Sequence, residues 1–189
     1  DAARRTLDRA TLDVDPPQAF RSLEVRRASG LLLANESWNQ SRARGLRIQA
    51  SHGVSEGNRL ERIKNLAISL GSEYAFWREA GWVEDVAIRG NIIRETGFDE
   101  RYFSSNSYAP GAIVVQHQLE NKSLPYPRGN RNLSITGNRI ENVGLAGIAI
   151  TAASNVLISG NQLSAFNQVD GKLTGAAHRI GAQTAISIN

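Results

Sequence analysis

The phrase Glu56-Gly57-Asn58-Arg59-Leu60 recurs along the chain as Arg89-Gly90-Asn91-Ile92-Ile93, Thr136-Gly137-Asn138-Arg139-Ile140 and Ser159-Gly160-Asn161-Gln162-Leu163. A looser copy, Ala34-Asn35-Glu36-Ser37-Trp38, lies upstream, and the successive asparagines are 23, 33, 47 and 23 residues apart. Repetition of a short phrase at intervals of this size is typical of a solenoid, in which each repeat packs only on its neighbours. The shortest interval therefore predicts one bare coil.

Short alternating apolar segments precede each copy of the phrase. Alternation with a period of two indicates a strand with one buried face. Strands of this kind are expected at 86–88, 133–135 and 156–158, and a further strand before them at 46–48, 66–68, 112–115, 148–150 and 186–188. No apolar pattern of helical length competes with them. The sequence thus predicts an all-β protein, a right-handed parallel β-helix that forms a single-stranded solenoid over residues 23–189.

The Gly-Asn pair suits the corner between two strands of a coil. Both residues tolerate a left-handed backbone, and stacked Asn side chains can form hydrogen bonds from coil to coil. We therefore expect Asn58, Asn91, Asn138 and Asn161 to belong to the scaffold.

Four loops are expected to interrupt the coils, at 71–82, 92–111, 117–132 and 162–183. Insertions in solenoids collect where ligands bind, because the scaffold does not need them. Residues 1–22 do not fit the coil pattern and are expected to be a flanking segment or the end of a preceding domain. The last strand pattern runs to the end of the chain, and we expect the sequence to be a fragment of a longer one.

Composition limits the functional classes. The chain has 189 residues, no cysteine and a net charge of +4, with basic and acidic residues interleaved. This favours neither a disulfide framework nor a nucleic-acid partner, and no run of about 18 apolar residues predicts membrane insertion. No phosphate loop, nucleophile elbow or zinc-binding helix motif occurs. We expect no metal and no cofactor.

Aromatic residues gather in the expected loops. Eight of the twelve lie between Tyr74 and Tyr108, and an exposed aromatic ring can stack on the apolar face of a sugar. Trp77 is the preferred platform, although these rings can equally seal the loops onto the body. Glu73 and Glu79 flank it and are the candidate catalytic acid and base, because glycoside hydrolysis needs two carboxyl groups.

A polar shelf is expected beside these loops. The outward positions of the first strands carry Arg47, Gln49, Ser69, Gln116 or His117, and Thr151. Among them, Arg47, Gln49 and His117, together with Arg44, are the candidate substrate-binding residues. Glu84 and Asp85 are interpreted as solvated or bonded to the backbone, and His52 shows no neighbouring ligand pattern.

The sequence resembles bacterial parallel β-helix carbohydrate-active proteins over residues 23–189. More narrowly, it is similar to the α-1,3-galactosidases of glycoside hydrolase family 110, through residues 41–46 followed by Glu56-Gly57-Asn58, and through residues 70–86 with Trp77 and Glu79. That resemblance implies hydrolysis of terminal α-galactosides by an acid pair without a cofactor. Glu73 stands where that family tends to carry an aspartate, and the adjacent aspartates associated with its catalysis are not found.

Three functional readings follow. The first is a glycoside hydrolase that cleaves an extracellular glycan, with an α-galactoside as one candidate and an oligo- or polysaccharide as substrate. The second is a non-catalytic glycan-binding module of an adhesin or other surface protein. The third is a uronan lyase or epimerase, in which Arg44, Arg47 and His117 would neutralise a carboxylate and remove a proton. The fold suggests a bacterial protein that is secreted, periplasmic or on the cell surface; the sequence does not indicate the oligomeric state.

Overall fold

The computed structural model describes residues 23–29, 32–41, 44–71, 82–99, 111–116, 129–169 and 185–188. All regular elements in these ranges are β-strands. None of the described segments forms a helix that is long and apolar enough to cross a membrane. The predicted all-β class is thus confirmed. Residues 1–22, expected to flank the coils, lie outside the described ranges.

The strands form three parallel sheets, which we call A, B and C. Sheet A contains β1 (Leu23–Ser29), β4 (Leu46–Ser51), β7 (Ile68–Leu70), β10 (Gly111–Val115), β13 (Ala146–Ile150) and β16 (Ile186–Ile188). Sheet B contains β2 (Leu32–Ala34), β5 (Gly53–Glu56), β8 (Glu84–Arg89), β11 (Asn130–Thr136) and β14 (Ala153–Ser159). Sheet C contains β3 (Ser37–Asn39), β6 (Arg59–Glu61), β9 (Ile92–Thr96), β12 (Arg139–Val143) and β15 (Gln162–Ser164).

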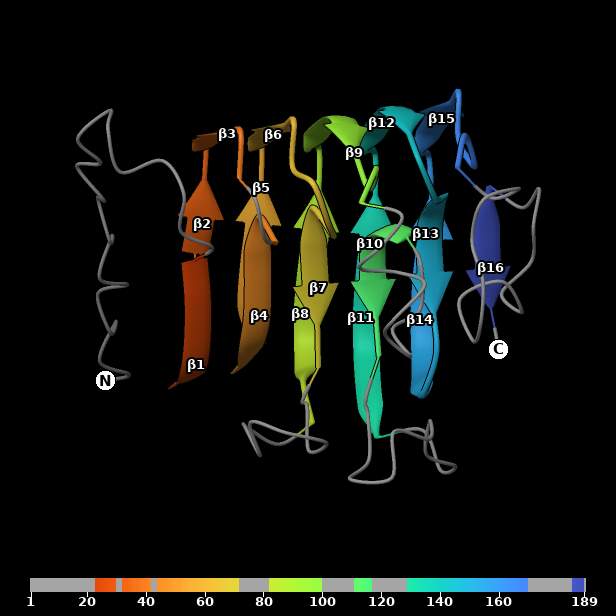
Figure 1. Cartoon of the computed structure of the whole chain (residues 1–189). Helices are drawn as coiled ribbons and strands as arrows, with labels where there is room; N and C mark the ends of the chain where they lie inside the picture. The colour runs from red at the N-terminus through yellow and green to blue at the C-terminus, as the bar shows by residue number, and fades with distance from the viewer. Residues whose placement is uncertain are drawn as a thin grey trace, which may run out of the picture.

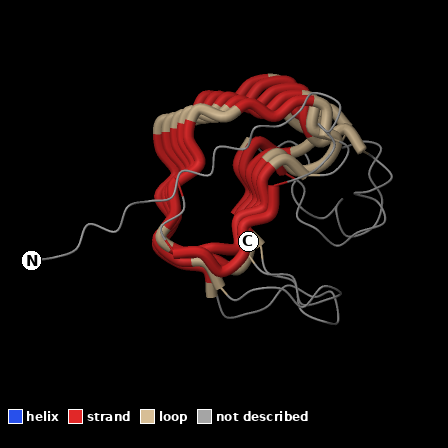
Figure 2. Tube along the Cα trace, turned by 90° about the vertical axis from the view of Figure 1, so that its left-hand side faces the viewer, coloured by secondary structure: helices blue, strands red, loops and turns tan. Residues whose placement is uncertain are grey.

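Each coil contributes one strand to each sheet in the order A, B, C. Every strand pairs in parallel with the equivalent strand of the next coil, so that Ile68 lies beside Ile113 and Ile113 beside Ile148. Figure 1 shows the coils side by side along the axis, and Figure 2 shows the strands overlying one another as the walls of one tube. The coils wind in the right-handed sense expected for parallel strands joined in this way. The predicted parallel β-helix is confirmed.

The inward side chains stack into continuous apolar rows. In sheet A the rows are Leu46, Ile68, Ile113, Ile148 and Leu70, Val115, Ile150, all within the core cluster. Burial of one such aliphatic side chain contributes about 1.5–3 kcal/mol. Because each row continues through successive coils, the core is shared along the whole solenoid.

Sheet C was not predicted from the sequence. Its strands are short and share one row of inward residues, Leu60, Ile93 and Ile140, which are fully buried, while Thr96 and Val143 are buried at the ends of β9 and β12. Most of the other residues in these strands are polar, so the segments resemble loops when they are considered singly. Two predicted loop ranges, 92–111 and 162–183, therefore begin too early, since β9 and β15 occupy their first residues. The predicted range 117–132 likewise ends too late, because β11 starts at Asn130.

The Gly-Asn corner between sheets B and C holds the expected Asn ladder. Asn58 donates from its backbone N–H and from Nδ2 to Oδ1 of Asn91, both at 3.0 Å. Asn91 repeats this toward Asn138, and Asn138 toward Asn161, at 2.9–3.0 Å. Each Nδ2 also donates to a backbone carbonyl, for example from Asn91 to Ser55 at 3.0 Å. Every amide in the ladder is satisfied, which confirms its structural role.

The first coil departs from the predicted spacing. Glu36, not Asn35, stands at the ladder position, and its backbone N–H donates to Oδ1 of Asn58 at 2.9 Å. Asn35 instead takes the left-handed position that Gly57 takes in the next coil, with φ of 58°. An alignment of Asn35 with Asn58 therefore shifts the first coil by one residue.

Replacing Glu36 by Asn is expected to extend the ladder by one amide. The new Nδ2 would donate to Oδ1 of Asn58, and the gain in the free energy of unfolding should be about 1 kcal/mol. Urea denaturation measures this. Glu36→Gln is the control, because it removes the same charge but its longer side chain cannot repeat the ladder geometry; an equal gain in both variants would show that the charge alone matters.

Candidate functional site

Two long insertions leave neighbouring coils at the same corner, between sheets A and B. β7 ends at Leu70 and β10 at Val115, which lie side by side, and the N–H of Gln116 donates to the carbonyl of Leu70 at 3.0 Å. The chain returns in β8 and β11, which also pair, with Glu84 beside Arg131. Segments 72–81 and 117–128 are thus tethered to adjacent positions at both ends. We call this region the A–B corner.

Four of the predicted site residues fall in these insertions. Glu73, Trp77, Glu79 and His117 lie outside the described residues, and their predicted roles stay predictions. Gly71 and Gln116 are the described residues at which these two insertions begin.

Arg47 and Gln49 lie on the outward face of sheet A, since Leu46 and Ile48 point into the core. With the Gln49 carboxamide oxygen oriented toward the guanidinium, it accepts from Nη2 and Nε of Arg47 at 3.1 and 3.2 Å. Both side chains are nevertheless buried, with exposed fractions of 5% and 3%.

Three further positions of the predicted shelf, Ser69, Gln116 and Thr151, are buried as well. Thr151 is held by the scaffold, since its hydroxyl donates to the carbonyl of Val115 at 3.2 Å. The prediction that these positions lie next to one another in successive coils is confirmed for Arg47 and Ser69, which pair across β4 and β7. The side chains at these positions of the predicted polar shelf are buried and not exposed to solvent.

Arg44 lies at the other end of β4, before the strand begins. Ser51 lies seven positions further along the chain, which corresponds to about 20 Å in an extended strand. Its carbonyl accepts a hydrogen bond from the hydroxyl of Ser41 at 3.1 Å. The structure therefore separates Arg44 from the A–B corner, where it was expected to help bind substrate.

A second side-chain stack runs along the A–B corner. His52, Asp85, Asn132 and Asn155 occupy equivalent left-handed positions in successive coils, with φ between 50° and 58°. Asn155 donates to Asn132 at 2.8 Å, Asn132 to Asp85 at 2.9 Å, and His52 Nδ1 lies 3.0 Å from Asp85 Oδ2. The sequence carries a signal for this stack, because each residue comes immediately before the first residue of a sheet B strand pattern, whereas an alignment on the Gly-Asn phrases alone does not show it.

Three ionisable side chains meet in this stack. Besides its contact with Asp85, His52 places Nε2 3.8 Å from Oε1 of Glu84. The three could offer ligand atoms within 4.8 Å of one another, and a His with two carboxylates suits a divalent transition metal. However, Arg131 already pairs with Glu84, and Asn132 donates to Asp85. The arrangement is satisfied as an ion-pair and hydrogen-bond network. It corrects the interpretation of Glu84 and Asp85 as solvated or bonded to the backbone, and of His52 as a residue without a neighbouring ligand pattern.

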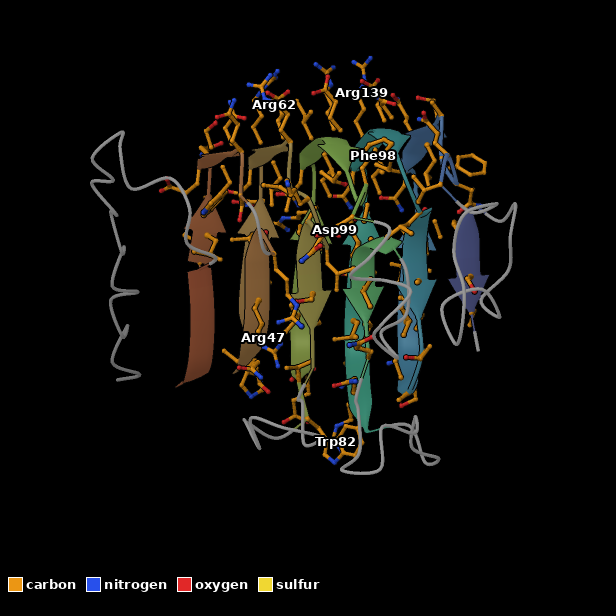
Figure 3. All side chains as sticks on the ribbon, in the orientation of Figure 1. Arg47, Arg62, Trp82, Phe98, Asp99 and Arg139 are labelled. Atoms are coloured by element: carbon orange, nitrogen blue, oxygen red, sulfur yellow. The ribbon has the colours of Figure 1, made fainter. Side chains whose placement is uncertain are left out.

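Trp82 presents an aromatic surface beside this network. Its exposed fraction is 41%, and its ring packs against Gly129 so closely that a Cβ at residue 129 would overlap with it. Val83 points into the core, so Trp82 and Glu84 both lie on the outward side. Figure 3 shows Trp82 on the lower side of the solenoid, opposite to Arg62 and Arg139 on its upper side. An exposed indole next to charged hydrogen-bonding groups is therefore held at the base of the two insertions.

The outward face of sheet C is charged but internally paired. Arg94 and Arg139 both contact Glu141, with Arg94 Nε at 2.8 Å. The hydrogen bond from Arg139 is the largest cause that lowers the pKa of Glu141; burial opposes it, and the positive charges of Arg139 and Arg94 lower the pKa further. A carboxyl group with a lowered pKa is ionised at neutral pH, so Glu141 is not a proton donor.

The chain matches no family model, no curated protein and no solved structure. The similarity to family 110 glycoside hydrolases therefore stays a prediction that rests on the motifs alone.

Proposed function

We propose that the protein is a carbohydrate-active β-helix protein that binds an oligo- or polysaccharide at the A–B corner and hydrolyses it. The observation that carries the proposal is Trp82, an exposed indole fixed against Gly129 where two insertions leave adjacent coils. Aromatic faces stack on sugar rings, and solenoid insertions collect at binding sites. A secreted, periplasmic or cell-surface location belongs to the same proposal.

The groups around Trp82 suit sugar hydroxyls. Glu84 and Asp85 offer acceptor oxygens, while His52 and Arg131 offer donors on the same outward surface. Hydroxyl groups both donate and accept, so a site that combines both kinds of partner can orient a neutral sugar. The stacked Asn132 and Asn155 extend this polar surface along the axis across two further coils.

Hydrolysis is assigned to Glu73 and Glu79 in the first insertion. One carboxylic acid would protonate the leaving oxygen, and the other carboxylate would activate water or attack the sugar directly. Terminal α-galactosides are the first substrates to test, because the family resemblance implies them.

The test is glycan turnover by the full chain and four variants. The substrates are aryl α-galactosides and a panel of neutral and uronic glycans. Released reducing ends measure turnover, and the affinity for each glycan is measured in parallel. Glu73→Gln or Glu79→Gln should reduce turnover by at least about 100-fold with little change in affinity. Trp82→Ala should weaken affinity about tenfold.

Glu141→Gln is the matched control, since it removes one carboxylate on sheet C, away from the A–B corner. Turnover that survives in both insertion variants would contradict the assignment of the catalytic pair. Affinity unchanged in Trp82→Ala would contradict the site itself.

A non-catalytic glycan-binding module is the second candidate. It is favoured by the network at the corner, in which Glu84 and Asp85 are held by Arg131 and Asn132 and not left for proton transfer. Affinity that depends on Trp82 without any released product would support it. A uronan lyase, which would give an unsaturated product, has less support, because Arg47 is buried against Gln49 and Arg44 lies at the other end of β4.

A further inference from the structure

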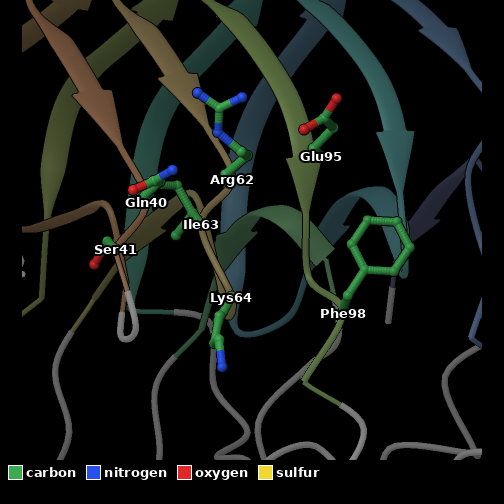
Figure 4. A pocket seen from close by; sticks show the side chains of 7 residues that line it. All are labelled: Gln40, Ser41, Arg62, Ile63, Lys64, Glu95 and Phe98. Atoms are coloured by element: carbon green, nitrogen blue, oxygen red, sulfur yellow. The ribbon is translucent and has the colours of Figure 1, made fainter.

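A pocket lies at the corner between sheets C and A, on the opposite side of the coils from Trp82. Its volume is about 510 Å³, within the range of small-molecule sites. The lining residues come from three successive coils: Gln40, Ser41, Arg62, Ile63, Lys64, Glu95 and Phe98. Figure 4 shows Gln40 on one side and the Phe98 ring on the other, with Arg62 and Lys64 between them.

The scaffold fixes the three segments that line this pocket. Gln40, Arg62 and Glu95 each adopt a left-handed backbone, with φ of 59°, 53° and 52°. Backbone hydrogen bonds join the coils here, from Gln40 to Glu61 and from Lys64 to Ser41, at 3.1 and 2.9 Å. The lining side chains therefore project from a corner whose spacing is set by the sheet.

The charged side chains of the pocket are available for a ligand. Within the described part of the chain, the side chains of Lys64 and Glu95 make no hydrogen bond or ion pair. Arg62 donates from Nε to Oδ1 of Asn39 at 2.9 Å, which fixes its position, and its terminal nitrogens have no partner among the described residues. Phe98 is 39% exposed, so one large apolar side chain faces solvent beside these charges.

The geometry points to a binding site for an acidic oligosaccharide, in which Phe98 stacks on a sugar face, and Lys64 and Arg62, which point in opposite directions in Figure 4, bind the carboxylates of different sugar residues. Two cations and Glu95 leave one net positive charge, which matches one carboxylate per sugar better than a polyphosphate. Glu95 and Gln40 supply the acceptor and donor that sugar hydroxyls require. This site is separate from the A–B corner and does not depend on the hydrolase proposal.

Calorimetric titration of the full chain tests this site. The probe is a trisaccharide of α-1,4-linked galacturonate, and its carboxyl-reduced galactose counterpart is the neutral comparison. The acidic sugar should bind at least about tenfold more tightly than the neutral one. Lys64→Gln should lose about tenfold in affinity and Phe98→Leu about fivefold.

Two controls separate the outcomes. Arg139→Gln removes one positive charge on sheet C outside the pocket and should change affinity less than about twofold. Trp82→Ala should also leave this affinity intact, so failure of the A–B corner proposal and failure of this one are distinguishable. Equal binding of both sugars, no binding, or equal losses in Lys64→Gln and Arg139→Gln would each overturn the assignment. Unchanged thermal melting of Lys64→Gln confirms that the variant is folded.

Discussion

Replacing Asn91 by alanine is expected to lower the free energy of unfolding by about 3 kcal/mol. Its Oδ1 accepts two hydrogen bonds from Asn58, and its Nδ2 donates to the carbonyl of Ser55 and to Oδ1 of Asn138. All these groups are buried, so alanine leaves donors and acceptors unsatisfied in a place that water does not reach. Denaturation in urea, followed by circular dichroism, gives the change directly.

Asn39→Ala is the control for this measurement. Asn39 is an exposed asparagine with one hydrogen bond, to Nε of Arg62, and its loss should cost less than about 0.5 kcal/mol. A cost for Asn91→Ala no larger than for Asn39→Ala would mean that the ladder does not stabilise the coils.

Gly71→Ala is expected to have the largest effect, about 4 kcal/mol of destabilisation. Gly71 has a φ of 104°, and a Cβ there would overlap with the backbone oxygen of Gln116. That oxygen belongs to the next coil, at the point where the second insertion begins, so neither group can move without separating β7 from β10. Thermal and urea denaturation should both report the loss.

Gly90→Ala separates the clash from backbone strain. Gly90 also has a left-handed backbone, with φ of 60°, but a Cβ there would meet no atom within 4 Å. Gly90→Ala should therefore lower the free energy of unfolding by only about 1 kcal/mol, which is the cost of a left-handed backbone at alanine. If Gly71→Ala proved no more harmful than Gly90→Ala, the proposed close approach of the two coils at the A–B corner would be incorrect.

The sequence predicted the fold well, for a physical reason. Sheets A and B contain alternating apolar residues such as Val86 and Ile88, and the Gly-Asn phrase marks a corner that few other residues can occupy. Sheet C escaped prediction because its strands show no alternation of apolar residues, and Leu60 and Ile93 form a row only by stacking on neighbouring coils. Local pattern therefore shows strands with alternating buried residues better than strands without that alternation.

The candidate site was predictable only in part. The positions of the insertions followed from the interrupted repeat, but the contact of His52 with Asp85 joins residues that are distant in sequence and depends on the register of β5 against β8. Arg47 and Gln49 were placed correctly on the outward face, whereas their burial could not be predicted from alternation alone. Periodicity gives the direction of a side chain but not what packs upon it.

The Asn ladder also has an electrical direction. Three side-chain amides donate toward the next coil, from Asn58 to Asn91, from Asn91 to Asn138 and from Asn138 to Asn161, so their dipoles point the same way along the solenoid axis. Aligned amides polarise one another, and each bond in such a chain is strengthened by those on either side. The coils are thereby joined by a cooperative, polarised chain, in which the amides at the middle are bound more firmly than those at either end.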